Sequence, residues 1–155
     1  MPEPILPHRK DDALLADIAA ARAEADQLHV WWLGQSGFLI QWAGRHLLFD
    51  PYLTDSLTRK YAATDKPHIR MTECPLNPAE ITNADLILCS HKHSDHLDPG
   101  TVPAMMSASP NASVVLPRSL IEHAAAMGVP RGRMFGTDAG ARVQGFVHEI
   151  GRAHV

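Results

Sequence analysis

Alternation of apolar and polar positions predicts strands in the first third of the chain. Residues 30–42 alternate in this way and are interrupted by Gly34 and Gly37, a pattern that predicts two strands joined by a tight turn. A turn at residues 43–45 and a third strand at residues 46–49 are predicted to come next. The tryptophans of this region are expected to pack within the core or between sheets: Trp31, Trp32 and Trp42.

The later part of the chain alternates strands with helices. Short apolar runs predict strands at residues 85–90 and 112–116. Asp98 is expected to cap a helix that ends near Ser107. The remaining predicted elements are a helix at residues 118–127 closed by Gly128, and short strands at residues 134–136 and 142–148 around a turn at residues 138–140. This alternation predicts an α/β domain rather than an all-β one.

The first 28 residues differ in pattern from the rest of the chain. Residues 1–10 contain three prolines and no periodicity, so they are predicted to form an irregular arm. Residues 11–26 are predicted as an amphipathic helix, because Leu14, Leu15 and Ile18 form one apolar stripe. We expect this helix to pack against the domain rather than to carry function.

The composition is that of a soluble globular protein with a single ordinary core. The chain has 155 residues, of which 45% are hydrophobic and 20% charged. A formal net charge of -3 leaves no basic face, so nucleic acid is not expected as a partner. Two lone cysteines, no apolar run long enough to span a membrane and no signal pattern at the start predict a cytoplasmic location.

Potential metal ligands are concentrated immediately after the predicted strand at residues 85–90. Three imidazoles and one carboxylate fall within six residues: His91, His93, Asp95 and His96. In an extended segment His91, His93 and Asp95 would point to the same side, and His96 would come either from the next face or from a turn that brings it round. Nitrogen and oxygen ligands of this kind favour zinc, iron or manganese over calcium.

Four ligands this close can hold one metal ion or two adjacent ions. In the second case His91 and His93 would bind one ion, and Asp95 and His96 the other. The alternative is a solvated histidine-rich loop without chemistry, which we regard as the weaker interpretation because the ordered cluster comes directly after a buried strand.

The pattern His-x-His-x-Asp-His after an apolar strand resembles the signature of the metallo-β-lactamase-fold hydrolases. Residues 30–40 and 47–52 resemble the opening strands of the branch related to ascorbate-6-phosphate lactonase, and the resemblance extends over about residues 30–147. It implies an αββα sandwich of which this chain supplies the N-terminal half, preceded by a helix. It also implies a metal-dependent hydrolase.

The resemblance implies a role for each residue of the cluster. His91, His93 and His96 would be neutral metal ligands, and Asp95 either a ligand of a second metal or the catalytic base that takes a proton from water. Asp50 ends the third predicted strand and can cap the adjoining turn. The resemblance implies instead that Asp50 accepts hydrogen bonds from the metal-binding loop and holds its shape. One or two divalent ions are expected, with zinc first and manganese or iron as alternatives.

The other ligands that the family uses, two histidines and a bridging aspartate, are expected beyond this chain, and no ligand role is assigned to His123, His148 or His154. Residues 150–155 correspond to one reading frame of a widely used sequencing adapter before a stop codon. We therefore expect an arm and helix at residues 1–28, an incomplete domain at 29–149 and a non-native tail at 150–155. This N-terminal fragment is predicted to be poorly soluble and inactive by itself.

For the full-length protein we predict hydrolysis of a small molecule, a lactone or a phosphorylated metabolite, by a metal-activated water. One alternative is a phosphodiesterase or nuclease of the same fold, and another is a non-catalytic metal-binding or interaction module. Residues 52–80 are predicted as a long irregular connection. Its basic residues can meet an anionic substrate group, although solvated charge explains each of them singly: Arg59, Lys60, Lys66, His68 and Arg70.

Overall fold

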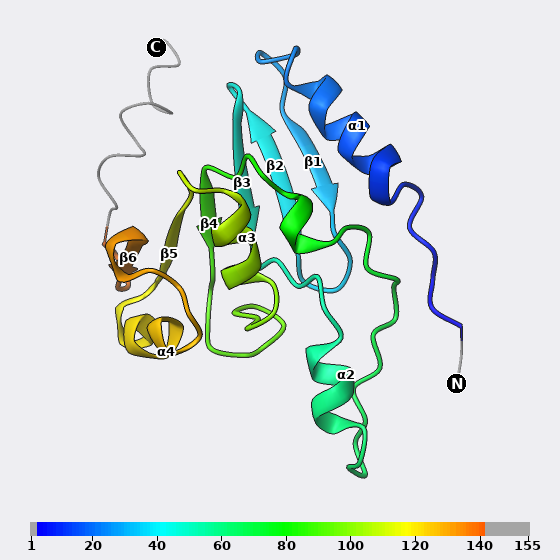
Figure 1. Cartoon of the computed structure of the whole chain (residues 1–155), viewed down its shortest axis with the longest axis vertical. Helices are drawn as coiled ribbons and strands as arrows, with labels where there is room; N and C mark the ends of the chain where they lie inside the picture. The colour runs from blue at the N-terminus through cyan, green and yellow to red at the C-terminus, as the bar shows by residue number, and fades with distance from the viewer. Residues whose placement is uncertain (1–2, 142–155) are drawn as a thin grey trace.

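The computed structural model of the protein describes residues 3–141 (Figure 1). The helices and strands are, in chain order, α1 (Asp11–Ala21), β1 (His29–Trp32), β2 (Phe38–Trp42), β3 (Arg45–Phe49), α2 (Ser56–Tyr61), β4 (Leu86–Leu88), α3 (Val102–Ala108), β5 (Ser113–Pro117), α4 (Ile121–Ala126) and β6 (Met134–Thr137). Three single-turn 3-10 helices lie at Pro78–Glu80, Arg118–Leu120 and Arg131–Arg133. Among residues 3–141 no helix has the length and apolar character needed to cross a membrane.

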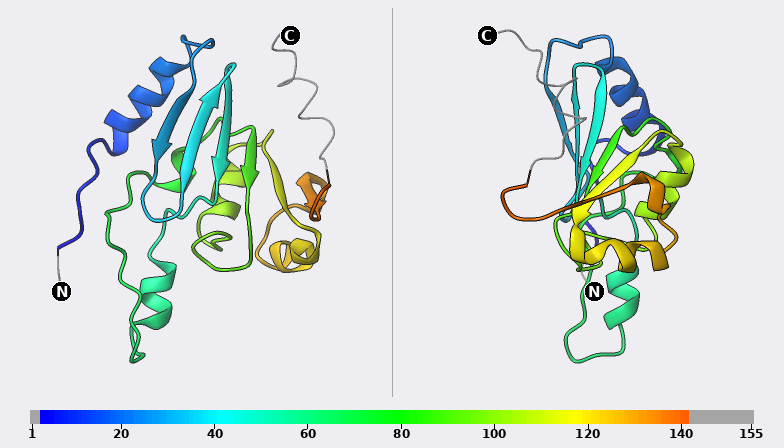
Figure 2. Two further views of the ribbon diagram at one scale, coloured as in Figure 1. Left: turned by 180° about the vertical axis from the view of Figure 1, so that it is seen from behind. Right: turned by 90° about the vertical axis from the view of Figure 1, so that its left-hand side faces the viewer.

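The strands form one six-stranded sheet in the order β1-β2-β3-β4-β5-β6. β2 pairs antiparallel with β1 and with β3, whereas β3 to β6 run parallel to one another. Helices α1 and α3 lie on the same side of this sheet (Figure 2). The prediction of an α/β fold that resembles half of a sandwich, preceded by a helix, is therefore confirmed.

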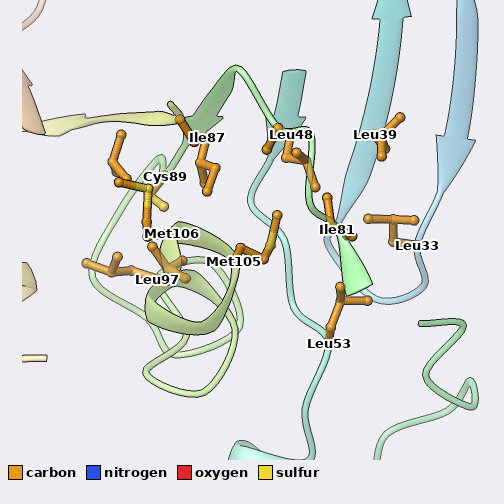
Figure 3. Close-up of a cluster of buried hydrophobic side chains, with 14 of the residues drawn as sticks. Leu33, Leu39, Leu48, Leu53, Ile81, Ile87, Cys89, Leu97, Met105 and Met106 are labelled. Carbon is orange, nitrogen blue, oxygen red and sulfur yellow. The ribbon is translucent and has the colours of Figure 1, made fainter. Parts of the chain in front are cut away.

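The face of the sheet under the helices forms the hydrophobic core. Strand pairing aligns Leu39, Leu48, Ile87 and Val114 in one row across four strands, and all four side chains are buried. Figure 3 shows how side chains of α3, among them Met105 and Met106, close over these strands. Complete burial of each such side chain stabilises the fold by roughly 1.5–3 kcal/mol relative to exposure. The core therefore fixes the ends of β3 and β4 rigidly beside each other.

The opposite face of the sheet is apolar as well, and its aromatic side chains on β1, β2, β3 and β6 are exposed, whereas Val115 on β5 is buried. A second row crosses all six strands: Trp32, Phe38, Phe49, Leu88, Val115 and Phe135. Trp32 is 58% exposed and Phe38 41% exposed. The expected packing of Trp32 is thus not found within the described residues, whereas Trp31 packs against the core. An apolar face of this extent is typical of a surface that another layer covers.

Most predicted elements are present, with shifted boundaries. α1 ends at Ala21 rather than at residue 26 because the chain continues in tight turns that bury nothing, with Ala23 N donating to Ala20 O. α3 begins at Val102 with Thr101 as its N-cap residue, and the carboxylate of Asp98 binds the Thr101 hydroxyl rather than a backbone N–H of the helix. The predicted strand at residues 142–148 and the tail at 150–155 lie outside the described residues.

Helix α2 is the element that the sequence pattern missed. Its six residues contain none that is buried, so no apolar stripe marks it. Tertiary hydrogen bonds hold it instead: Leu57 N donates to the Tyr52 hydroxyl at 3.1 Å, and Arg70 N to Thr58 Oγ1 at 3.2 Å. The connection at residues 52–80, which was predicted to be irregular, therefore contains a helix held by hydrogen bonds to neighbouring loop residues.

The two faces of β2 should respond in opposite ways to mutation. We expect the chain to bind an environment-sensitive apolar dye and to self-associate, and Phe38→Thr to reduce both while changing the free energy of unfolding by less than about 1 kcal/mol. Leu39→Ala, one residue away on the buried face, should cost about 2–5 kcal/mol in urea unfolding. Equal losses of stability in the two variants would contradict this assignment of the faces.

Candidate metal centre

The histidine cluster lies in the loop after β4, at the edge of the sheet where the parallel strands β3 and β4 both end. The loop is not extended. It consists of bends and turns closed by two backbone hydrogen bonds, from His96 N and Leu97 N to His93 O, at 2.9 and 2.8 Å. The prediction that alternation along an extended segment aligns the side chains is therefore wrong. Turns of the backbone gather them.

The structure brings all four predicted side chains together. His91 Nε2 lies 3.0 Å from His93 Nδ1, and Asp95 Oδ2 lies 3.6 Å from His96 Nε2. The rings of His91 and His96 are also in contact, with centroids 4.0 Å apart. His93 is exposed, whereas His91, Asp95 and His96 are half-buried.

The spacing within each pair suits two ligands of one ion. On a tetrahedral ion with bonds of about 2.0–2.1 Å, two ligand atoms are separated by roughly 3.3 Å. The pair His91 and His93 and the pair Asp95 and His96 both come close to this separation. Within residues 3–141 no three His, Cys, Asp or Glu side chains are arranged to hold one ion. Each pair therefore offers a partial ligand set.

Asp50 supports the loop from the end of β3. Its carboxylate accepts hydrogen bonds from Ser90 N at 2.7 Å and Ser90 Oγ at 2.6 Å, and it lies 2.9 Å from His96 Nδ1. The backbone of Asp50 adopts φ 43°, a left-handed conformation that Asp tolerates better than most residues. The side chain thus contacts the histidine loop and leaves His96 Nε2 as the nitrogen that lies toward Asp95.

Ser36 also contacts this loop, and no sequence motif had indicated it. Its hydroxyl donates to the carbonyl oxygen of Asp95 and lies 3.5 Å from that of Asp50. Ser36 lies in the turn between β1 and β2, which approaches the segment after β3 closely, since a Cβ on Gly37 would lie 3.3 Å from Pro51 Cα. The glycine spacing of this turn was the available signal, but it shows only a turn and not what the turn contacts.

Arg70 does not belong with the exposed basic residues of the long connection. It is buried, and its guanidinium donates to the carbonyl oxygens of Thr72 at 2.7 Å and Tyr52 at 2.9 Å. It is therefore unavailable to an anionic ligand, in contrast to the prediction. The other four remain exposed on the connection that carries α2: Arg59, Lys60, Lys66 and His68.

Cys89 lies between β4 and the histidine loop but is a poor candidate ligand. Burial raises the pKa of its thiol to about 12, so that the thiol is neutral at physiological pH. A cavity of about 550 Å³ lies elsewhere, between the N-terminal arm and β1, and none of the four predicted ligands lines it.

Comparison with known proteins places these observations in a family. Residues 29–150 match the family described as Beta-lactamase superfamily domain. A UPF0173 metal-dependent hydrolase of Opitutus terrae is 34% identical over 101 residues, which cover 65% of this chain and 36% of that protein. A probable L-ascorbate-6-phosphate lactonase of Salmonella heidelberg is 26% identical over 121 residues, 67% of this chain and 34% of that protein. The chain thus spans about a third of the length of these curated relatives.

A solved structure supports the same fold. The isothiocyanate hydrolase from Delia radicum gut bacteria superposes with a TM-score of 0.51 at 18% identity, covering 74% of this chain and 43% of that one. The predicted resemblance to the lactonase-related branch is confirmed by the sequence matches.

Replacement of Asp50 should weaken zinc binding without unfolding the chain. Asp50→Asn keeps a residue that tolerates positive φ, but its amide cannot accept all of the bonds from Ser90 and His96. We expect the dissociation constant for Zn²⁺, measured by competition with a chromogenic chelator, to rise about 10–100-fold.

Asp85→Asn is the matched control for this measurement. Asp85 binds Arg45 and the backbone of His46 at the opposite end of β4. Its replacement should lower stability and leave zinc affinity unchanged. Equal zinc affinity in Asp50→Asn and the unaltered chain would show that the Asp50 contact does not matter for the ion.

Proposed function

The chain belongs to the beta-lactamase superfamily, and from this membership we propose that residues 29–149 form the metal-binding half of a metal-dependent hydrolase. The observation that carries the proposal is the arrangement of two ligand pairs in one loop, His91 with His93 and Asp95 with His96, against the Asp50 carboxylate. The family match begins at residue 29, which supports treating residues 1–28 as a separate arm and helix.

We propose a separate role for each residue of the loop and for Asp50. His91 and His93 would hold one divalent ion, and Asp95 and His96 a second. A bound ion supplies an acidic water molecule and a positive charge for a carbonyl or phosphoryl oxygen. The contact of Asp50 with His96 Nδ1 would leave Nε2 available as the ligand nitrogen. Asp95 would serve as a ligand or as the base that accepts a proton.

Zinc is the ion that we propose first, because imidazole nitrogen and carboxylate oxygen suit it, with manganese and iron as alternatives. Each pair supplies two ligands, fewer than the four that a structural zinc site uses or the three of a catalytic one. The proposed activity therefore requires further ligands, and we assign it to a protein that contains them. We also propose that this protein is cytoplasmic.

The proposed substrate is a small lactone or phosphorylated molecule. The similarity to a probable L-ascorbate-6-phosphate lactonase supports this class. Helix α2 extends beyond the edge of the sheet at which β3 and β4 end (Figure 1). This helix and the residues after it carry the exposed Arg59, Lys60 and Lys66, which we propose as the groups that meet an anionic substrate group. A phosphodiesterase of the same fold would use the same residues, so substrate choice needs a direct test.

Activity of a protein that contains this chain together with the further ligands would test the proposal. We expect hydrolysis of aliphatic lactones that depends on added divalent metal, and little hydrolysis of bis(p-nitrophenyl) phosphate. His93→Ala should lower kcat/KM by at least about 100-fold because it removes a ligand, whereas Lys92→Ala, exposed beside it, should leave kcat/KM unchanged. Preference for the phosphodiester would favour the alternative enzyme. Unaltered hydrolysis by His93→Ala would remove the metal site from the mechanism.

A further inference from the structure

We propose that Asp98 is a positioning residue that locks the segment after β3 to the histidine loop. This inference rests on the proposed function in so far as the loop binds metal. Asp98 was predicted to cap a helix with its side chain. In the structure only its backbone oxygen accepts helical hydrogen bonds, from Val102 N at 3.0 Å and Thr101 N at 3.3 Å. Its carboxylate serves a different purpose.

The carboxylate of Asp98 is completely buried and bound by three hydroxyl groups. Oδ2 accepts hydrogen bonds from Thr101 Oγ1 at 2.6 Å and Thr54 Oγ1 at 2.8 Å, and Oδ1 accepts one from Ser56 Oγ at 2.7 Å. A carboxylate without such donors would be costly to bury. Two of the three donors come from the segment after β3, which is remote in sequence from Asp98.

Two of these hydroxyls also hold the backbone of that segment. Thr101 Oγ1 accepts a hydrogen bond from Leu53 N at 2.9 Å, and Thr54 Oγ1 accepts one from Ser56 N at 3.2 Å. Each hydroxyl thus accepts from a backbone N–H and donates to the carboxylate. One buried carboxylate therefore organises residues 53–56.

Close packing at Gly100 is independent evidence that the two segments fit together. A Cβ at Gly100 would lie 2.7 Å from Thr54 Cγ2, closer than real Cβ contacts, and 3.5 Å from Asp98 Oδ2. A side chain at this position would require Thr54 to shift, so glycine lets Thr54 approach the carboxylate. Hydrogen bonds and sterics thus specify the same contact.

This contact matters for the metal site because it is the second link between the same two segments. The first is the contact of Asp50 with His96, at 2.9 Å. Asp98 lies two residues after His96, and Thr54 lies four residues after Asp50. Two links at neighbouring points prevent the segments from sliding or rotating past each other. Asp98 thereby holds Asp50 where it meets the ring of His96.

Asp98→Ala in the 155-residue chain tests the proposal by two readouts. Hydrogen exchange of backbone amides, measured without metal by mass spectrometry, should accelerate at least about tenfold in peptides covering residues 51–57 and 89–97 but not in those covering β5. The dissociation constant for Zn²⁺ should rise about 10–100-fold. Asp98→Asn should recover part of both, because an amide still accepts from some of the hydroxyls and donates to others.

Ser109→Ala is the matched control, since Ser109 is also buried and binds Ile81 O and Ala84 N at the far end of α3. It should lower the midpoint of thermal unfolding without changing loop exchange or zinc affinity. If Asp98→Ala behaves like Ser109→Ala, the positioning role is overturned. If both loops loosen in Asp98→Ala while even the unaltered chain binds no zinc, the positioning role stands and the proposed metal site fails.

Discussion

The arrangement of the candidate site depends on the contact between Asp50 and the loop after β4. Because β3 and β4 are parallel neighbours, their C-terminal ends meet at one edge, and Asp50 N donates to Leu88 O at 2.8 Å just beyond the paired strands. The carboxylate can therefore reach Ser90 and His96 without a long excursion of the chain. The left-handed backbone at Asp50 is the local cost of this geometry, and three hydrogen-bond contacts offset it.

Residues around this contact hold the loop with the four potential ligands through hydrogen bonds. The Ser36 hydroxyl binds the backbone of Asp95, and the Asp50 carboxylate contacts the ring of His96. The Asp98 carboxylate binds Thr54, in the segment that follows Asp50. Each of these polar groups lies at the end of a strand or in a loop, whereas the strands themselves are held by the apolar core. The sheet supplies rigidity, and the loops supply chemistry.

The partial ligand pairs and the exposed apolar face lie next to each other. Phe49 and Leu88, in the second row of the sheet, come just before Asp50 and the histidine loop. A layer that covered this face would also approach the pairs His91 with His93 and Asp95 with His96. Within residues 3–141 the same edge of the sheet thus has exposed apolar side chains and incomplete ligand sets, and one additional structural unit can supply both apolar cover and further ligands. This agrees with our proposal that the activity belongs to a protein with further ligands.

The sequence by itself determined the strands, the α/β class, the family and the cluster from His91 to His96, because each of these is specified by residues close together in the chain. The tertiary structure alone decided what surrounds the cluster. Ser36 and Asp95 are 59 residues apart, Thr54 and Asp98 are 44 apart, and Asp50 and His96 are 46 apart. No local pattern specifies such pairings, so the burial of Arg70, the role of Asp98 and the short helix α2 were misjudged or missed. Periodicity records which face of an element is buried, whereas hydrogen bonds between distant loops exist only after the core has placed the ends of the strands side by side.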